Sequence, residues 1–258
     1  MPEEFDLERR FGGLRRLYGD VEYQHLRSLR VAVVGLGGVG SWAVEALARS
    51  GVASLTLIDL DHVAESNINR QVQALSATLG QHKGDALKAR VAGIHPGCEV
   101  RVIDAFVDAE NWPLLVGSRH FDGLIDACDQ VRAKAALATW ARQSRVPFVC
   151  VGAAGGKQRA EALEVADLAD TSHDPLLASL RARLRREHGA ARQGRIGVRC
   201  IFSREAVAHP AKPDSACAID GSLNCAGYGS SVMVTASFGM AAAGELVAQA
   251  LKKNPRTP

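Results

Sequence analysis

The sequence predicts an α/β fold: a doubly wound, mostly parallel sheet with a C-terminal α+β elaboration. Two observations lead to this prediction. Between residues 30 and 156, short apolar runs alternate with stretches of helical spacing, and a glycine-rich turn (GLGGVG, 35–40) joins the first run to the first helix. Hydrophobic residues make up 47% of the 258 residues, which is enough to bury the core of such a sheet.

Each expected strand is a short apolar run of the kind that is buried on both faces of a parallel sheet. These runs lie at 30–35, 55–59, 99–107, 121–128 and 146–152. The segments between them have the apolar spacing of helices, at 39–50, 81–94 and 131–144. Because strands and helices alternate, right-handed crossovers would make the strands parallel.

The regular alternation ends after Gly156, where a less regular half begins. Asp174 and Pro175 form a helix start, with Asp as the cap and Pro at the first helical position, and this helix should end near His188. The other expected elements are strands at 163–166 and 196–202, a long loop at 209–231 and a final helix at 232–253. We expect one integrated domain made of a helical arm at 1–29, a core at 30–156 and an elaboration at 157–258.

Composition excludes several classes of protein. The formal net charge of +3 is too small to indicate a nucleic-acid partner by itself. The six cysteines form no C-x-x-C pair, which argues against a structural zinc site and a disulfide scaffold. The N-terminal segment MPEEFDLERRF lacks the apolar centre of a signal peptide, and the final helix contains Glu245 and Gln249, so we expect it to be buried rather than to cross a membrane. We therefore expect a cytoplasmic protein with no membrane partner.

The glycine-rich turn predicts a nucleotide site of the Rossmann-like type. Glycines let the backbone approach a phosphate at the N-terminus of a helix, and four are available here: Gly35, Gly37, Gly38 and Gly40. Asp59 ends the second strand, where a carboxylate accepts hydrogen bonds from a ribose. A tight turn without a ligand would have similar glycines, and the turn together with Asp59 would by itself favour NAD.

Polar residues downstream favour a nucleoside triphosphate instead. They follow strand ends that should face one ligand crevice. They are Asp61, Asn67, Arg70, Gln71, Lys83, Asp126 and Asp129. Three phosphates require neutralising cations, here Arg70 and Lys83, and a carboxylate to hold Mg²⁺. The alternative for the two cations is an ordinary solvated surface charge.

Five ordered segments resemble the adenylation domain of the ubiquitin-activating-like (ThiF-type) superfamily: GLGGVG, LIDLD, SNINRQ, GQHK and DACD. The resemblance implies ATP and Mg²⁺ as cofactors. It also implies that a substrate carboxylate attacks the α-phosphate of ATP, which forms an acyl-adenylate and releases pyrophosphate.

The same resemblance implies roles for individual residues. Asp59 would hold the ribose, Asn67, Arg70 and Lys83 would surround the phosphates, and Asp129 would help to hold Mg²⁺. Members of the superfamily work as dimers in which an N-terminal arginine reaches the ATP of the partner, and Arg16 is the best match to it. We therefore expect a homodimer.

A narrower resemblance extends over nearly the whole chain. The segments RFGGLRRLYG (10–19), VGAAGGK (151–157) and VRCIFSRE (198–205), with SACA and NCAGYGS near the end, are similar to the tRNA threonylcarbamoyladenosine dehydratases. That family uses ATP to close the threonylcarbamoyl group beside the anticodon to an oxazolone. The resemblance implies tRNA as the substrate, and it brings a monovalent alkali cation and a sulfur-relay partner (a cysteine desulfurase) into consideration. The alternative is adenylation of the C-terminal glycine of a ubiquitin-like sulfur carrier, although activators of that branch usually carry the two C-x-x-C pairs that are missing here.

A run of arginines supports a nucleic-acid partner. Between residues 181 and 199 the only acid is Glu187, and such a cluster suits a phosphate backbone. The seven arginines are Arg181, Arg183, Arg185, Arg186, Arg192, Arg195 and Arg199. The alternative is a solvated helix face followed by a loop.

The cysteines have two interpretations. Cys200, Cys217 and Cys225 lie in segments that match the narrower family, so a thiol could take part in acyl or sulfur transfer. We favour buried small residues, because a free cysteine most often behaves as a small hydrophobic side chain in the core. Cys128 is expected to serve packing.

Overall fold

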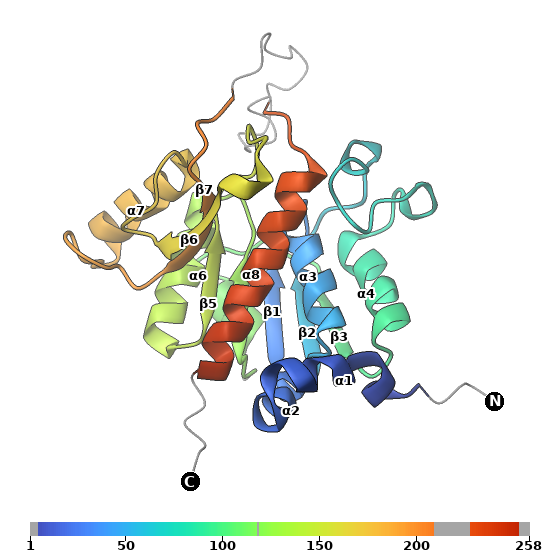
Figure 1. Ribbon diagram of the computed structural model, residues 1–258. Coiled ribbons are helices and arrows are strands. Elements are labelled where there is room, and N and C mark those ends of the chain that lie inside the picture. The colour runs from blue at the N-terminus through green and yellow to red at the C-terminus, as the bar shows by residue number, and fades with distance from the viewer. Residues whose placement is uncertain (1–4, 118, 209–227, 253–258) are drawn as a thin grey trace.

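The structure is a computed structural model that describes residues 5–117, 119–208 and 228–252 (Figure 1). It contains a seven-stranded sheet in the order β3-β2-β1-β4-β5-β7-β6. All neighbouring strands are parallel except β6 and β7, so the prediction of a mostly parallel α/β sheet is confirmed. The strands are β1 (Arg30–Val34), β2 (Ser54–Ile58), β3 (Glu99–Ile103), β4 (Gly123–Asp126), β5 (Phe148–Val151), β6 (Leu163–Asp167) and β7 (Arg199–Ser203).

Helices cover both faces of the sheet, as a doubly wound fold requires (Figure 1). Alternate residues of β1 separate two apolar cores: Val31 and Val33 pack with α3, α4 and α8, whereas Ala32 and Val34 pack with α5, α6 and α7. The helices are α1 (Leu7–Tyr18), α2 (Asp20–Ser28), α3 (Gly40–Arg49), α4 (Lys83–Ile94), α5 (Trp112–Val116), α6 (Val131–Ser144), α7 (Pro175–Glu187) and α8 (Val232–Lys252).

The element boundaries differ from the sequence prediction where side chains interrupt the backbone pattern. The last strand begins at Arg199 rather than 196, because the amides of Ile196 and Gly197 both donate to the Asp167 carboxylate at 2.8 Å instead of joining the sheet. Helix α5 was not predicted, because its five residues are too few to show a helical period. The long loop expected at 209–231 lies mostly outside the described residues, as does Lys253.

Helix α8 packs one face against α3 and the sheet, whereas Met233 and Met240 on its other face are exposed. Its polar residues take part in this packing. Glu245 accepts a hydrogen bond from Arg199 at 3.0 Å, and Gln249 accepts one from the amide of Phe148 at 3.3 Å. Gly239 lets α8 approach α3, because a Cβ there would lie 2.7 Å from the Cβ of Trp42. Within the described ranges, α8 is the one helix long and apolar enough to cross a membrane, and here it lies against α3 and the sheet (Figure 1).

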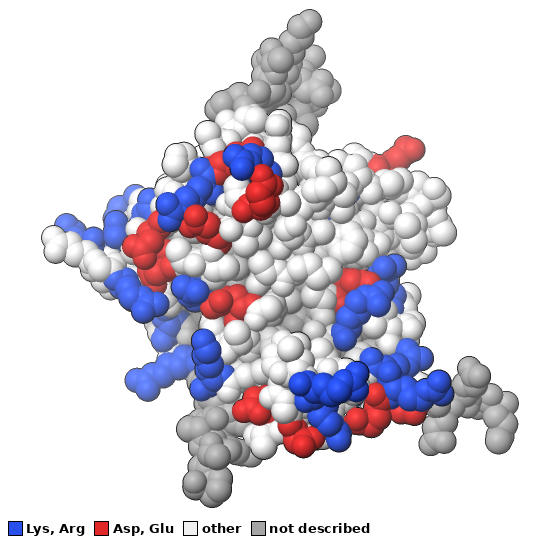
Figure 2. Space-filling model, in the orientation of Figure 1, with Lys and Arg blue, Asp and Glu red and all other residues white. Residues whose placement is uncertain are grey.

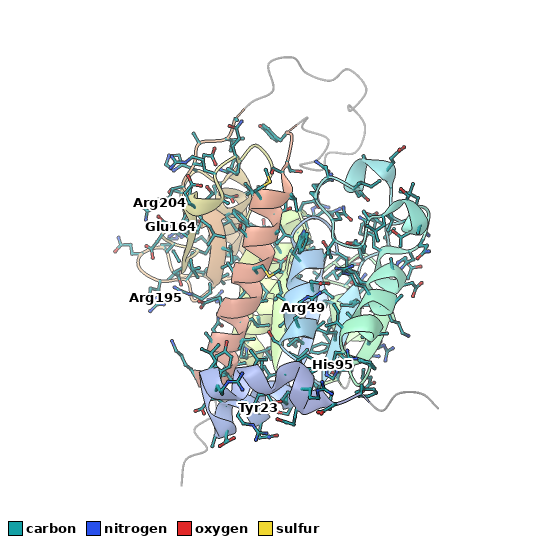
Figure 3. All side chains as sticks on the ribbon, turned by 45° about the vertical axis from the view of Figure 1, so that its right-hand side comes forward. Tyr23, Arg49, His95, Glu164, Arg195 and Arg204 are labelled. Atoms are coloured by element: carbon teal, nitrogen blue, oxygen red, sulfur yellow. The ribbon has the colours of Figure 1, made fainter. Side chains whose placement is uncertain are left out.

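Helices α1 and α2 form an arm at the end of the sheet where α3 and α4 terminate. Arg10 donates to the carbonyl of Ile94 at 2.7 Å, and Arg27 donates to the carbonyl of Gly51. Phe11 meets the His95 ring edge to face, with the ring centroids 4.8 Å apart. His95 lies beside the arm (Figure 3). The arm is therefore fixed to the amino-terminal edge of the sheet by both apolar and polar contacts.

We expect His95 to make this docking sensitive to pH. Burial, and then the charges of Arg27 and Arg10, lower the pKa of His95 from 6.5 to about 4. A histidine whose pKa is lower in the folded than in the unfolded chain contributes stability that is complete above pH 6.5 and is lost as the pH falls toward 4. We expect the melting temperature to fall over this interval, and to fall less in His95→Gln.

The measurement is thermal unfolding at pH 4 to 7, with His25→Gln on α2 as the matched control. Parallel pH profiles for the wild type and His95→Gln would show that another group governs acid sensitivity.

Candidate active site

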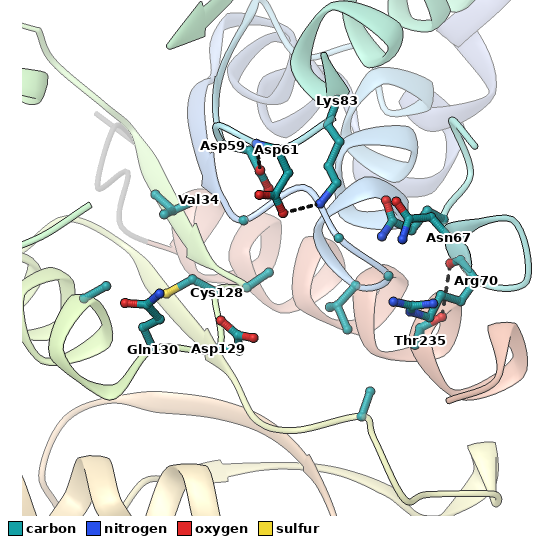
Figure 4. Close-up of a pocket in the computed structure, with 18 of the residues that line it drawn as sticks. Val34, Asp59, Asp61, Asn67, Arg70, Lys83, Cys128, Asp129, Gln130 and Thr235 are labelled. Atoms are coloured by element: carbon teal, nitrogen blue, oxygen red, sulfur yellow. Dashed lines mark hydrogen bonds and ion pairs between the residues drawn. The ribbon is translucent and has the colours of Figure 1, made fainter. Parts of the chain in front are cut away.

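A cavity of about 350 Å³ lies at the carboxyl edge of the sheet, where a parallel α/β fold binds ligands (Figure 4). Its walls come from the segments that follow β1, β2, β3, β4 and β5, with single residues added by α7 and α8. It contains nearly all of the nucleotide-site residues that the sequence pattern selected, and two of those residues lie elsewhere.

The glycine-rich turn lines one side of the cavity through Gly35, Gly37 and Gly38. Gly35 has φ +85°, and a Cβ there would lie 2.8 Å from the backbone of Ala127, so only glycine lets the ends of β1 and β4 meet. Gly40 differs from the other three glycines of the turn. It does not line the cavity, and a Cβ at this position would overlap the carbonyl of Gly35, so its role is to let the turn close onto α3.

Asp59 follows β2 and lines the cavity. The sequence predicted a carboxylate at this position that would bind the ribose of the nucleotide. Its Oδ2 accepts a hydrogen bond from the Leu36 amide at 2.6 Å, and its Oδ1 accepts one from the Asp61 amide at 2.8 Å. The carboxylate therefore also ties the glycine-rich turn to the end of β2.

Lys83 begins α4 and forms an ion pair with Asp61, with 2.6 Å between Nζ and Oδ2 (Figure 4). The lysine side chain is only 8% exposed, whereas that of Asp61 is 55% exposed. The cation is thus held at the cavity wall by a partner that can turn toward solvent.

Arg70 supplies the second cation of the wall. Its Nη1 donates to the carbonyl of Ser66 at 2.7 Å and to Asn69 Oδ1 at 3.0 Å, and its own carbonyl accepts hydrogen bonds from Trp42 and Thr235. Arg70 is half-buried, and burial lowers the pKa of its guanidinium. An incompletely hydrated cation interacts more strongly with an anionic ligand.

Two amide side chains stand beside these cations. Asn67 and Gln71 are nearly buried and line the cavity. Asn67 accepts a hydrogen bond from the amide of Ala64, and Gln71 accepts one from Gln73. Both amide groups are therefore oriented by their own turn.

The end of β4 carries two aspartates that point in different directions. Asp129 lies in the loop after the strand and lines the cavity, half-buried (Figure 4). Asp126 is fully buried, does not line the cavity and pairs with Lys134 at 3.2 Å, so its assignment to ATP is wrong. Alternate residues of a strand face opposite sides, and Asp126, like Leu124, faces the α6 layer.

The described cysteines differ in position: Cys150 and Cys200 are buried in strands, whereas Cys128 is half-buried and lines the cavity. Burial and the neighbouring Asp126 carboxylate raise the pKa of the Cys128 thiol, which keeps it protonated. Cys200 is fully buried in β7, and Cys217 and Cys225 lie outside the described residues. In the part of the chain that the structure describes, no three His, Cys, Asp or Glu side chains group as a metal site.

Several lining residues were missed by sequence reasoning. The segments 105–107 and 152–155 follow β3 and β5, and the rule that strand ends face the crevice could have selected both. Gln130 lies in the same loop as Asp129. Thr235 comes from α8, far along the chain, and no local signal marks it.

Arg16 is exposed on α1 and lies away from the cavity of its own chain. The arm docks where α3 and α4 end, through Ile94 and Gly51, whereas the cavity lies where these helices begin. Within one chain, Arg16 is therefore at the opposite edge of the sheet.

The arginines of 181–199 lie on and after α7, where Figure 2 shows blue and red atoms mixed. Within 181–199 the sequence contains one acid, Glu187, that could neutralise these arginines. The fold brings two more acids to them: Asp167 lies 4.0 Å from Arg195, and Glu245 pairs with Arg199. Arg183 and Arg186 both pair with Glu187.

The seven arginines therefore differ in their surroundings. Arg181 donates to the carbonyls of Leu168 and Thr171 and joins α7 to the preceding turn, and Arg185 donates to the carbonyl of Ala191. Arg186, Arg192 and Arg195 are the exposed members.

A doubly wound sheet whose carboxyl edge combines a glycine-rich turn, a strand-end carboxylate and two cations defines a nucleotide-binding protein of the adenylating class. The chain belongs to the ThiF family, which matches residues 12–257. This confirms the superfamily resemblance of the sequence motifs.

Relatives match the chain over nearly its whole length. The tRNA threonylcarbamoyladenosine dehydratase of Escherichia coli is 43% identical over 95% of this chain and 92% of the relative. That of Haemophilus influenzae is 39% identical over 95% of each. The crystal structure of the E. coli tRNA N6-threonylcarbamoyladenosine dehydratase TcdA in complex with ATP has a TM-score of 0.87, with 40% identity and 97% of both chains covered.

Proposed function

We propose that this protein uses ATP to cyclise the threonylcarbamoyl group of the modified adenosine beside the tRNA anticodon. The observation that carries the proposal is the likeness to the ATP-bound E. coli dehydratase over 97% of both chains, including the C-terminal elaboration. The cavity at the carboxyl edge, with its two cations, is the part of this chain that suits ATP.

The chemistry follows from the leaving groups. The threonyl carboxylate oxygen attacks the α-phosphorus of ATP, the bond to the bridging oxygen breaks, and pyrophosphate leaves. The carbamoyl oxygen then attacks the acyl carbon, AMP leaves, and the carbamoyl nitrogen loses its proton as the oxazolone closes. Both steps require positioning and stabilisation of charge, and neither requires a covalent nucleophile of the enzyme.

The lining residues have distinct roles in this proposal. Asp59 binds the ribose, and the amides of the glycine-rich turn approach the phosphates. Arg70 and Lys83 neutralise the charge that develops during attack, with Asn67 and Gln71 as hydrogen-bonding groups beside them. A phosphate near Lys83 would replace Asp61 as the ion-pair partner of the lysine. Asp61 is the more exposed member of this pair.

Asp129 is the residue that would hold Mg²⁺. The donor set fits this ion, because Mg²⁺ in ATP sites is bound through one or two carboxylates together with phosphate oxygens and water. Asp129 lies half-buried in the cavity wall, in a cavity without three clustered ligands among the described residues. When bound, the ion supplies neutralisation of phosphate charge.

The proposal is tested by ATP–pyrophosphate exchange with two substrates in parallel. One is tRNA that carries threonylcarbamoyladenosine, with the same tRNA lacking the threonylcarbamoyl group as its control, and the other is a sulfur-carrier protein ending in Gly-Gly. We expect exchange with the modified tRNA, and loss of one water from its nucleoside by mass spectrometry. Exchange with the carrier protein alone would overturn the proposal.

The remaining parts of the proposal concern the surroundings of the reaction. They are a monovalent alkali cation as a further cofactor, a sulfur-relay (cysteine desulfurase) partner and a cytoplasmic location, in a chain that folds as one integrated domain. The same exchange assay, run with and without potassium and with and without a desulfurase, tests the first two.

The exposed arginines should bind tRNA through its phosphates. We expect replacement of Arg186, Arg192 and Arg195 by alanine to weaken tRNA binding and to reduce the salt dependence of affinity by up to about one unit of slope per lost contact. ATP affinity should not change, because these side chains lie outside the cavity lining.

The measurement is tRNA affinity as a function of salt concentration. The matched control replaces the same arginines by lysine, which keeps the charge and should keep most of the binding. Normal tRNA affinity in the alanine variant would place the tRNA on another surface.

A homodimer would bring Arg16 to the ATP of the partner. Arg16→Ala and Lys83→Ala should each be inactive, and mixing them should restore one working site per mixed dimer, which is roughly a quarter of wild-type activity for random exchange. Light scattering checks the assembly and turnover checks the rescue. A fully active monomer would contradict this expectation.

A further inference from the structure

A fully buried ion pair lies beside the cavity but does not line it. Lys134 on α6 and Asp126 at the end of β4 are both 0% exposed, with 3.2 Å between Nζ and Oδ1. Lys134 Nζ also donates to the carbonyl of Val151 at 2.7 Å. The reaction as derived above uses neither side chain.

The pair joins two strand ends at the point where their ladder stops. The last paired residues of β4 and β5 are Asp126 and Cys150, and beyond them the strands separate into the cavity-lining segments 127–130 and 152–155. Lys134 reaches one strand through the Asp126 carboxylate and the other through the Val151 carbonyl. Lys134 therefore links β4 and β5 through its side chain at the position just beyond their last backbone pair.

The carboxylate also orders the loop that carries Asp129. Asp126 Oδ1 accepts hydrogen bonds from the Cys128 amide at 3.2 Å and from its thiol at 2.9 Å. On the other strand end, the amide of Ala153 donates to the Asp174 carboxylate at 2.8 Å. Both segments are thus held by carboxylates that do not themselves line the cavity.

A buried ion pair contributes little net stability, because desolvation opposes the attraction, and such pairs serve geometry instead in the best-attested examples. Burial alone would lower the pKa of Lys134, but Asp126 and the nearby thiols raise it above its ordinary value, so the amine remains charged. A charged amine with several donors can hold both strand ends at once.

We propose that Lys134 is a positioning residue that holds the segments 127–130 and 152–155 in register and so places Asp129 for the reaction. The expected effect on rate rests on the proposed function, whereas the expected effect on backbone exchange does not.

The test replaces the pair together, as Lys134→Met with Asp126→Asn, because removing one charge alone would leave the other buried and unpaired. The matched control is Arg30→Met with Asp122→Asn, which breaks an ion pair of 3.0 Å at the opposite ends of β1 and β4, away from the cavity. Thermal unfolding establishes that each variant is folded.

Amide hydrogen exchange is the first readout. We expect faster exchange confined to 127–130 and 152–155 in the Lys134 variant, and wild-type exchange of these segments in the control. The second readout is kinetic: kcat should fall by about tenfold to a hundredfold, while the KM for ATP changes by less than about threefold, because β1 and β2 still hold the turn and Asp59.

The two proposals fail in different ways. A wild-type protein that does not cyclise the threonylcarbamoyl group of tRNA contradicts the proposed function. The amide hydrogen exchange result still decides the role of Lys134 in that case. A folded paired variant with wild-type exchange, or with wild-type kcat beside an active wild type, overturns the inference. If the paired variant does not fold, Lys134→Gln with Asp126→Asn, which removes both charges and keeps neutral hydrogen-bonding groups, is measured in the same way. Failure of both variants to fold would show that the pair serves the whole fold and overturn the inference.

Discussion

Replacing Arg70 or Lys83 by alanine is expected to reduce the rate of ATP-dependent turnover by about 10²–10³ for each residue. Both cations lie in the wall of one cavity, where Lys83 is buried and Arg70 is half-buried. A preorganised charge in such a site stabilises the transition state more than a solvated one, so its loss lowers kcat more than it weakens the binding of ATP.

The measurement is steady-state cyclisation with saturating tRNA, with ATP affinity determined separately by calorimetry. Lys88→Ala is the matched control, because Lys88 is an exposed lysine on the same helix as Lys83. Lys83→Ala leaves Asp61 half-exposed to water, so the variant should remain folded. Near-normal turnover in either active-site variant would show that the phosphates lie elsewhere.

Replacing Asp129 by alanine is expected to abolish Mg²⁺-dependent turnover and to leave the melting temperature near that of the wild type. Asp129 lies in a loop beyond the end of β4, so its side chain contributes little to the apolar core. Calorimetry with ATP, with and without Mg²⁺, gives a readout that is independent of turnover. The variant should bind ATP with less dependence on Mg²⁺ than the wild type.

Asp59→Asn is the contrasting variant. It weakens a predicted ribose contact while keeping an acceptor for the Leu36 amide, so it should raise the KM for ATP with a smaller effect on kcat. Unchanged activity of Asp129→Ala across a Mg²⁺ titration would contradict the assignment of this residue to the metal.

Much of the candidate site could be predicted because it consists of residues that follow strand ends. In a parallel sheet all carboxyl ends meet at one edge, so locating the strands also brings Gly35, Asp59 and Asp129 together. The cations could be predicted for the same reason, since the segments that carry them connect β2 to α4 along that edge. The order of the five sequence segments that contain these residues then indicated the family.

The error at Asp126 arose because a side chain near a strand end can face either of two layers. Asp126 and Asp129 are three residues apart, and both follow the apolar run of β4, but strand alternation turns the first toward α6 and leaves the second in the cavity. Gly40 has the sequence signature of a phosphate contact, and its place is instead set by the carbonyl of Gly35.

The sequence by itself determined the order of the strands and of the longer helices between them, the parallel sheet and the edge at which the site lies, because these follow from local apolar periodicity and from the handedness of crossovers. Only the tertiary structure decided which charges are compensated, such as Arg199 by Glu245 and Lys134 by Asp126. It also decided that Thr235 lines the cavity. These contacts join residues far apart along the chain, so no local pattern contains them.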